Sequence, residues 1–124
     1  MMSSDDQPLG RPPIARPVGV VSASDLAKLM GENLSFLAKS ESAGQIFCLE
    51  LLGEKLYPAF FADGRYPREY LFLVTKRLGK VSGGAKMQFF EQPKGSLGGI
   101  SPLEALERGM LALVKRSADG FRER

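Results

Sequence analysis

The chain has 124 residues, of which 44% are hydrophobic and 25% are charged, and its formal net charge at pH 7 is +3. These values are ordinary for a soluble globular protein that forms one domain, or two very small ones that share a core. No apolar run approaches the roughly 20 residues that cross a bilayer. The N-terminus lacks the apolar region of a signal peptide and carries Asp5 and Asp6, so we expect a cytoplasmic protein that does not contact a membrane.

The sequence contains no histidine and a single cysteine, Cys48. A lone cysteine cannot form a disulfide within the chain. Without histidine, Ser-His-Asp and Cys-His nucleophile arrangements are excluded, and so are zinc sites of the His₂Cys₂ and Cys₄ kinds. Enzymes built on carboxylates or lysine are not excluded by composition, but no spacing here indicates one. We therefore expect a protein that is not an enzyme and that binds no metal or cofactor.

Positive charge is concentrated in the second half of the chain. Residues 1–62 contain 5 lysines and arginines against 7 acidic residues, whereas residues 63–124 contain 12 against 7. The C-terminal half is therefore the part that a polyanion or an acidic surface would meet more favourably.

The first elements in chain order are an arm and two short helices. Residues 1–17 are rich in Pro, Ser, Asp and Gly, so we expect a disordered arm. Residues 22–31 predict a helix that is capped by Ser22 or Ser24 and ended by Gly31. Residues 32–43 predict a second helix, which Gly44 ends. The residues expected to face the core are Leu26, Leu29 and Met30 in the first helix, and Leu34, Leu37 and Ala38 in the second.

A change of period after Gly44 predicts a β-hairpin. Its strands are residues 45–52 and 55–60, with a turn at Gly53-Glu54 and Pro58 near the strand edge. Two helices joined by a tight turn form a helix-turn-helix, and the hairpin completes a winged-helix-like unit over residues 18–62.

Residues 63–124 predict a module of three helices. The first runs from Pro67 to Gly79, and the second covers residues 83–91 with Ser82 as its cap. A glycine-rich loop follows, and then "SPLE", residues 101–104, predicts a capping box that starts a last helix over residues 102–118. The backbone N–H groups at this helix start could instead cradle a phosphate, but capping already satisfies them. The predicted fold class is therefore α+β and mostly α.

The segment "FFEQPKGSLGGISPLEALERG" and the upstream "LYPAFF" resemble the toxin-binding domain of Xre/MbcA/ParS-type antitoxins. In that family a helix that ends in an aromatic residue is followed by P-x-x-x-L-G-G-x-x-P and then by a P-L-(D/E)-x-L helix. The resemblance covers residues 56–120. The matching positions are Phe89 or Phe90, Pro93, Leu97, Gly98, Gly99, Pro102, Leu103, Glu104, Leu106 and Gly109.

The resemblance implies a helical module that forms a homodimer and grips a partner toxin, often an NAD-consuming enzyme of the RES type. It also implies that antitoxin and toxin together repress their own operon, through the N-terminal part of the antitoxin. The C-terminal tail would then reach towards the active-site cleft of the toxin. The partner-binding residues expected on this basis are Leu97, Gly98, Gly99, Pro102, Glu104, Lys115, Arg116, Arg122 and Arg124.

The helix-turn-helix has two interpretations. It binds operator DNA, or it is a pair of packed helices without a groove contact. For DNA binding, Lys28, Lys39 and Lys55 would contact phosphates, and Asn33 and Ser35 would read bases. A second set of cations is either a basic face for DNA or toxin, or a solvated helix surface: Arg65, Arg68, Lys76, Arg77 and Lys80.

Three functions follow from these observations. The first is an antitoxin that neutralises a partner toxin and regulates its own operon. The second is a stand-alone DNA-binding transcriptional regulator that uses the C-terminal module only to dimerise. The third is an adaptor or structural protein that does not bind DNA.

Overall fold

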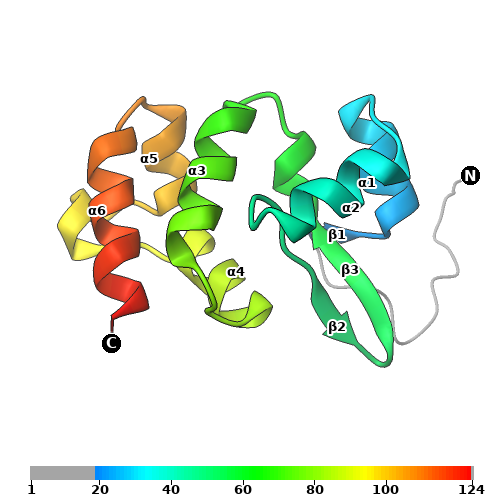
Figure 1. Ribbon diagram of the computed structural model, residues 1–124. Coiled ribbons are helices and arrows are strands. Elements are labelled where there is room, and N and C mark those ends of the chain that lie inside the picture. Colours follow the sequence, from blue (N-terminus) through cyan, green and yellow to red (C-terminus); the bar gives the residue numbers. More distant parts are fainter. Residues whose placement is uncertain (1–18, 124) are drawn as a thin grey trace, which may run out of the picture.

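The computed structural model describes residues 19–123 of the chain (Figure 1). The expected arm, residues 1–17, and Arg124 lie outside the described residues. Within 19–123 the protein is mostly helical with a small antiparallel sheet, so the predicted α+β, mostly α, class is confirmed. None of the helices in this range combines the length and the apolar character that crossing a membrane requires.

The elements follow one another from one end of the molecule to the other (Figure 1). The first end holds β1, α1, α2 and the β2–β3 hairpin, and the other end holds α5 and α6, with α3 and α4 between them. Their bounds are β1 Val20–Val21, α1 Ala23–Met30, α2 Leu34–Ser42, β2 Leu49–Leu51, β3 Glu54–Pro58, the 3₁₀ helix η1 Ala59–Ala62, α3 Arg68–Leu78, α4 Gly83–Glu91, the 3₁₀ helix η2 Gly95–Leu97, α5 Pro102–Glu107 and α6 Leu111–Arg122.

Helix α1 starts and ends where the sequence predicts. The Ser22 hydroxyl accepts a hydrogen bond from the Asp25 backbone N–H at 3.1 Å, so Ser22 rather than Ser24 is the cap. Its apolar face was predicted less well, because Leu29 is 62% exposed whereas Leu26, Ala27 and Met30 are buried. The stretch is too short for spacing alone to decide whether Ala27 or Leu29 faces the core.

Helix α2 begins two residues later than predicted. Asn33 caps it by accepting a hydrogen bond from the Phe36 N–H at 2.8 Å. Leu37 and Ser40 of this helix face the core, while Leu34 is 55% exposed and Ala38 is exposed as well. The prediction that Leu34 and Ala38 face inward is therefore wrong, and only Leu37 of the predicted set is buried.

The sheet has the strand order β1-β3-β2, with both pairs antiparallel. The hairpin is shorter than predicted and its turn lies one residue earlier, at Leu52 and Gly53, which have φ values of 53° and 80°. Two consecutive positive φ angles are the mark of a two-residue hairpin turn that matches strand twist. The ladder ends at Pro58, so Phe60 belongs to η1 rather than to the strand. β1 was not predicted, because a strand of two residues has no period to detect.

Helix α4 agrees with its prediction, and α3 begins at Arg68, one residue later than predicted, with Pro67 as its N-cap. The apolar residues Leu71, Val74 and Leu78 of α3 are fully buried. The Ser82 hydroxyl caps α4 by accepting from the Ala85 N–H at 3.2 Å. The last predicted helix is instead two helices, α5 and α6, so the C-terminal module has four α-helices and not three.

The break between α5 and α6 is caused by Gly109, whose φ is 80°. The Gly109 N–H donates to the Leu106 carbonyl at 3.0 Å and the Met110 N–H to the Ala105 carbonyl at 2.9 Å. These two bonds form a Schellman motif, which ends a helix through a left-handed glycine. The turn lets α6 fold back against α5 and lie alongside α3 (Figure 1).

A cluster of phenylalanines forms the centre of the core. The Phe47 and Phe90 rings are stacked, with centroids 6.1 Å apart and an interplanar angle of 7°. Phe60, Phe61 and Phe89 surround this pair, with centroid distances of 5.0 to 6.2 Å between neighbouring rings. Because these residues come from both sides of residue 62, the winged-helix-like unit and the C-terminal module share one core.

Gly83, the first residue of α4, allows that helix to approach the hairpin. A Cβ atom at this position would lie 2.0 Å from the Cys48 carbonyl oxygen, whereas a Cβ at Gly84 would meet nothing within 4 Å. We expect Gly83→Ala to lower the free energy of unfolding by roughly 1–3 kcal/mol, as overpacking does. Gly84→Ala is the matched control and should be neutral or stabilising by about 0.5–1 kcal/mol. Equal denaturation midpoints for the two variants would contradict the close approach.

Candidate protein-binding surface

The glycine-rich loop between α4 and α5 is an ordered turn. Two backbone hydrogen bonds join its ends. The Lys94 N–H donates to the Ile100 carbonyl at 3.0 Å, and the Gly99 N–H donates to the Lys94 carbonyl at 2.9 Å. Gly98 and Gly99 have φ values of 75° and 88°, as a turn this tight requires. The side chain of Leu97 is buried and anchors the loop to the core.

One of the two hydrogen bonds of the predicted capping box is present at the start of α5. The Ser101 hydroxyl accepts from the Glu104 N–H at 3.1 Å, and Pro102 occupies the first helical position. The reciprocal bond was predicted incorrectly. The Glu104 carboxylate accepts from Arg108 Nη2 at 2.9 Å instead of returning to Ser101, because the i+4 arginine lies one turn further along the same exposed face.

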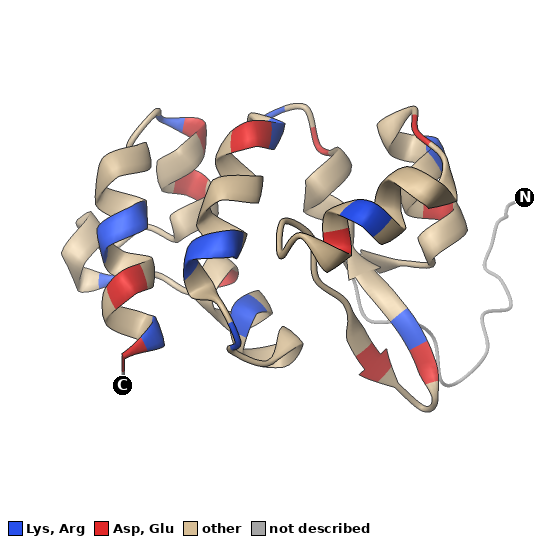
Figure 2. Ribbon diagram, viewed as in Figure 1, with Lys and Arg blue, Asp and Glu red and all other residues tan. Residues whose placement is uncertain are grey.

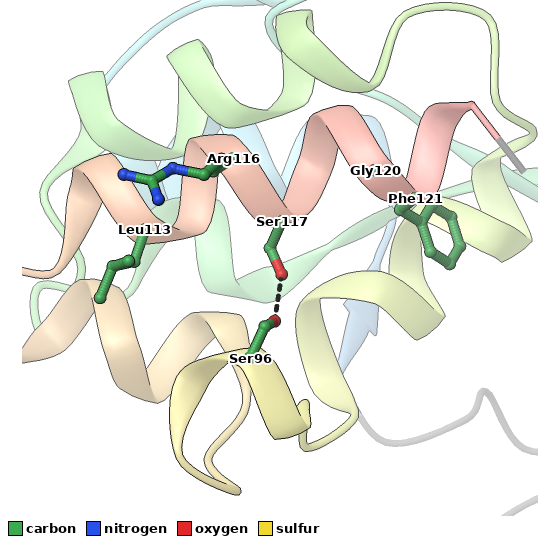
Figure 3. Close-up of a pocket in the computed structure, with 6 residues that line it drawn as sticks. All are labelled: Ser96, Leu113, Arg116, Ser117, Gly120 and Phe121. Atoms are coloured by element: carbon green, nitrogen blue, oxygen red, sulfur yellow. Dashed lines mark hydrogen bonds between the residues drawn. The ribbon is translucent and has the colours of Figure 1, made fainter.

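Together η2 and α6 form a hollow of about 320 Å³ (Figure 3). Its walls come from Ser96 of η2 and from one side of α6, namely Leu113, Arg116, Ser117, Gly120 and Phe121. The hydroxyls of Ser96 and Ser117 point towards each other across the hollow and are 2.9 Å apart. Leu113 and Arg116 lie at one end and Phe121 at the other.

The hollow combines a polar centre with apolar ends. Leu113 is 41% exposed, which leaves a large apolar side chain available at the rim. Phe121 is half-buried against Phe89, with ring centroids 5.3 Å apart, and the Lys94 ammonium lies 5.0 Å from the Phe121 ring centroid. Arginine and apolar side chains are common in protein interfaces, so this hollow is a candidate site for contact with a protein.

The predicted partner-binding residues are distributed over three places. Arg116 lines the hollow, and Gly98 and Gly99 are exposed on the adjoining turn. Leu97 and Pro102 are buried, so they support this surface from beneath. Glu104 lines a separate hollow with Tyr66 and Glu91, and Lys115 and Arg122 line a third between α3 and α6. Arg124 lies outside the described residues.

Several residues of the hollow were missed by sequence reasoning: Ser96, Leu113, Ser117 and Phe121. Three of them follow a spacing of four along α6, which places them on one side of the helix. That spacing was available in the sequence. The predicted helix was continuous from residue 102 to residue 118, so it neither included Phe121 nor separated α6 from α5.

The predicted DNA-binding residues are only partly available to a ligand. Lys28, Ser35 and Lys39 are exposed. Asn33 uses its side-chain oxygen as the cap of α2, so its expected role as a base reader is corrected to a structural one. Lys55 pairs with Glu41 of α2, with Nζ and Oε2 3.3 Å apart.

Glu41 connects α2 to the hairpin. Besides pairing with Lys55, it accepts a hydrogen bond from the Tyr57 hydroxyl at 2.8 Å and from the Cys48 thiol at 3.5 Å. Burial and this hydrogen bond raise the pKa of Tyr57 to about 12. Burial also raises the pKa of the Cys48 thiol, which keeps it protonated and unreactive at neutral pH.

No group of three metal-ligating side chains able to hold an ion occurs among residues 19–123. Comparisons with protein-family models, with curated proteins and with solved structures gave no match for this chain.

Asn33 and Ser35 should differ in their effect on stability. We expect Asn33→Ala to lower the free energy of unfolding by about 1 kcal/mol, because it removes the cap of α2. Ser35→Ala, in the same turn, leaves the Asn33 cap intact and should change it by less than about 0.5 kcal/mol. Chemical denaturation of the two variants checks this, and an undiminished stability of Asn33→Ala would show that the cap is dispensable.

Tyr57 makes the fold sensitive to alkali. Its pKa is about 12 when folded, against an ordinary value of 10.0. The unfolded chain therefore loses the phenolic proton first, so the contribution of Tyr57 to stability is complete below about pH 10 and is lost as the pH rises towards about 12. We expect Tyr57→Phe to be less stable than the parent at pH 7 and nearly equal to it at pH 12. Parallel stability curves for the two proteins would contradict this linkage.

Proposed function

We propose that this chain is an antitoxin-like protein of the cytoplasm, without enzymatic activity, that binds and neutralises a partner toxin through its C-terminal module. The observation that carries the proposal is the hollow between η2 and α6, which the glycine-rich turn and the Ser101 cap hold in place. These are the segments on which the resemblance to Xre/MbcA/ParS-type antitoxins rests.

The hollow supports a protein partner for two reasons. Leu113 offers an exposed apolar side chain, and Arg116 on the next turn offers five donors for a carboxylate or carbonyl. Apolar anchors and arginines are the side chains that contribute most to protein interfaces. The walls belong to a helix and to a turn that is fixed to the core, so little conformational entropy is lost when a partner binds.

Neutralisation would be occlusion of the toxin. The resemblance favours an NAD-consuming toxin of the RES type and a homodimeric antitoxin. The last turns of α6, which carry Phe121 and Arg122, would lie nearest the active-site cleft of such a toxin. Autoregulation of the operon by DNA binding belongs to the same proposal.

A stand-alone transcriptional regulator is the second candidate. The observation that favours it is the exposure of Lys28, Ser35 and Lys39 on the helix-turn-helix. In that case the C-terminal module would serve only to dimerise. A third candidate, an adaptor that binds neither DNA nor toxin, is supported by the use of Asn33 and Lys55 within the fold.

The test is co-expression of the tagged chain with the product of the adjacent reading frame. We expect a stoichiometric complex, and growth arrest when the partner is expressed alone. The variant Leu113→Ala/Arg116→Ala should weaken the complex by about tenfold or more, because it removes the apolar anchor and the guanidinium.

The control is Leu52→Ala, since Leu52 is 84% exposed at the hairpin tip on another part of the surface. It should leave the affinity unchanged. A homodimer that elutes without any partner would contradict the antitoxin proposal. Equal losses for both variants would place the partner elsewhere than on the hollow.

A further inference from the structure

The other flank of α6 borders a second surface, where the helix lies alongside α3. A cleft of about 240 Å³ is lined by Leu73, Lys76 and Arg77 of α3 and by Lys115 and Arg122 of α6. Figure 2 shows basic segments on both of these neighbouring helices. Four of the five lining residues are therefore cations, contributed by segments far apart in the sequence.

The two arginines of this cleft are held in fixed positions. Arg77 donates to both carboxylate oxygens of Asp119, from Nε at 2.9 Å and from Nη2 at 3.1 Å. Arg122 donates from Nη1 to the Arg77 carbonyl at 3.2 Å, near the C-terminal end of α3, where a cation is favoured by the helix dipole. Glu123 lies 3.7 Å from Arg122, so two carboxylates accompany the two arginines.

The two lysines supply the excess of positive charge. Within the part of the chain that the structure describes, Lys76 and Lys115 form no ion pair. They lie on opposite walls of the cleft, one on each helix. Their charge is available to an anion that enters from solvent.

The helix-turn-helix is less suited to a polyanion than this cleft. Lys55 is paired with Glu41, and Glu32 is exposed beside the turn, where it pairs with Arg68 at 3.0 Å. Helix α2 itself carries one lysine, Lys39, and the carboxylate of Glu41. Among the described residues, the α3–α6 cleft instead brings together two lysines that form no ion pair, Lys76 and Lys115.

We propose that the α3–α6 cleft binds the phosphate backbone of nucleic acid without reading its sequence. Lysine and arginine side chains that neutralise phosphates account for most sequence-independent affinity. Arginine could pair with a guanine edge, but the Arg77 guanidinium is engaged by Asp119 and that of Arg122 by the Arg77 carbonyl, so the cleft favours phosphate contacts over direct readout. An acidic protein is the less suitable ligand, because protein interfaces are depleted of lysine and centred on larger apolar areas than Leu73 provides.

The inference locates the DNA-binding part of the proposed function, and it does not depend on the toxin-binding part. It is tested with Lys76→Gln/Lys115→Gln and a short labelled DNA duplex of random sequence, followed by fluorescence anisotropy over a salt series. We expect the parent to bind at low salt, and the variant to bind about tenfold more weakly. The slope of log affinity against log salt should fall by about 2, which corresponds to two lost phosphate contacts.

The matched control is Lys28→Gln/Lys39→Gln, which removes the same charge from exposed positions of α1 and α2. It should retain most of the affinity and the slope. A greater loss in this control than in the cleft variant would overturn the inference while leaving a DNA-binding helix-turn-helix in place. No binding by the parent at low salt would also overturn it, whereas the toxin-capture experiment would be unaffected.

Competition with poly-glutamate shows whether the cleft prefers nucleic acid or an acidic protein. Displacement of the duplex by poly-glutamate at equal charge concentration would overturn the assignment to nucleic acid in favour of an acidic protein. Thermal unfolding followed by circular dichroism shows whether each variant is folded. Since all four lysines are exposed or at the surface of a cleft, we expect unchanged melting temperatures.

Discussion

The stacking of Phe47 on Phe90 is the contact on which the remaining structure depends. Phe47 lies just before the hairpin and Phe90 lies on α4, so the pair joins the winged-helix-like unit to the C-terminal module. Phe89, which precedes Phe90 in the chain, contacts the Phe90 ring edge-to-face and also contacts Phe121 of α6. The end of α4 is fixed by these contacts, and with it the start of the glycine-rich loop. The wall of the hollow at Phe121 is therefore an extension of the core.

Local signals in the sequence predicted several of the helix ends, because capping involves only neighbouring residues. The caps at Ser22, Ser82 and Ser101 were predicted, and so was the glycine stop at Gly31. Gly109 carries the same signal as Gly31. It was missed because Leu103, Leu106, Met110 and Leu113 fit the period of one continuous helix. A helical repeat of apolar residues is preserved when a left-handed glycine separates two short helices, so periodicity alone could not show the break.

The side of a short helix that faces the core was harder to predict than its ends. Leu29 and Leu34 fit an apolar stripe and are nevertheless exposed. Burial is decided by the elements that pack against the helix, which are α2, η1 and β3 for α1, whereas α2 packs against α1 and places Phe36 with its ring centroid 6.5 Å from that of Phe72 in α3. The residues of the candidate surface are hard to predict from the sequence for the same reason. Arg116 was expected from the family resemblance. The pairing of Ser96 with Ser117 joins residues from separate elements, so no local sequence pattern indicates it.

Helix α6 has three sides with different roles. Val114 and Ala118 face the core, Leu113 and Ser117 face η2, and Lys115 and Arg122 face α3. The two proposed binding surfaces therefore flank the same helix and are separated by little more than its width, which is about 10 Å. That distance exceeds the Debye length at physiological salt, about 8 Å, so charges on one flank are largely screened from those on the other, whereas at about 0.01 M salt, where the Debye length is about 30 Å, the two sets of charges interact. At low salt, a partner that brings carboxylates to Arg116 would therefore weaken the attraction of the α3–α6 cleft for phosphate. By linkage, bound nucleic acid would weaken the partner to the same degree.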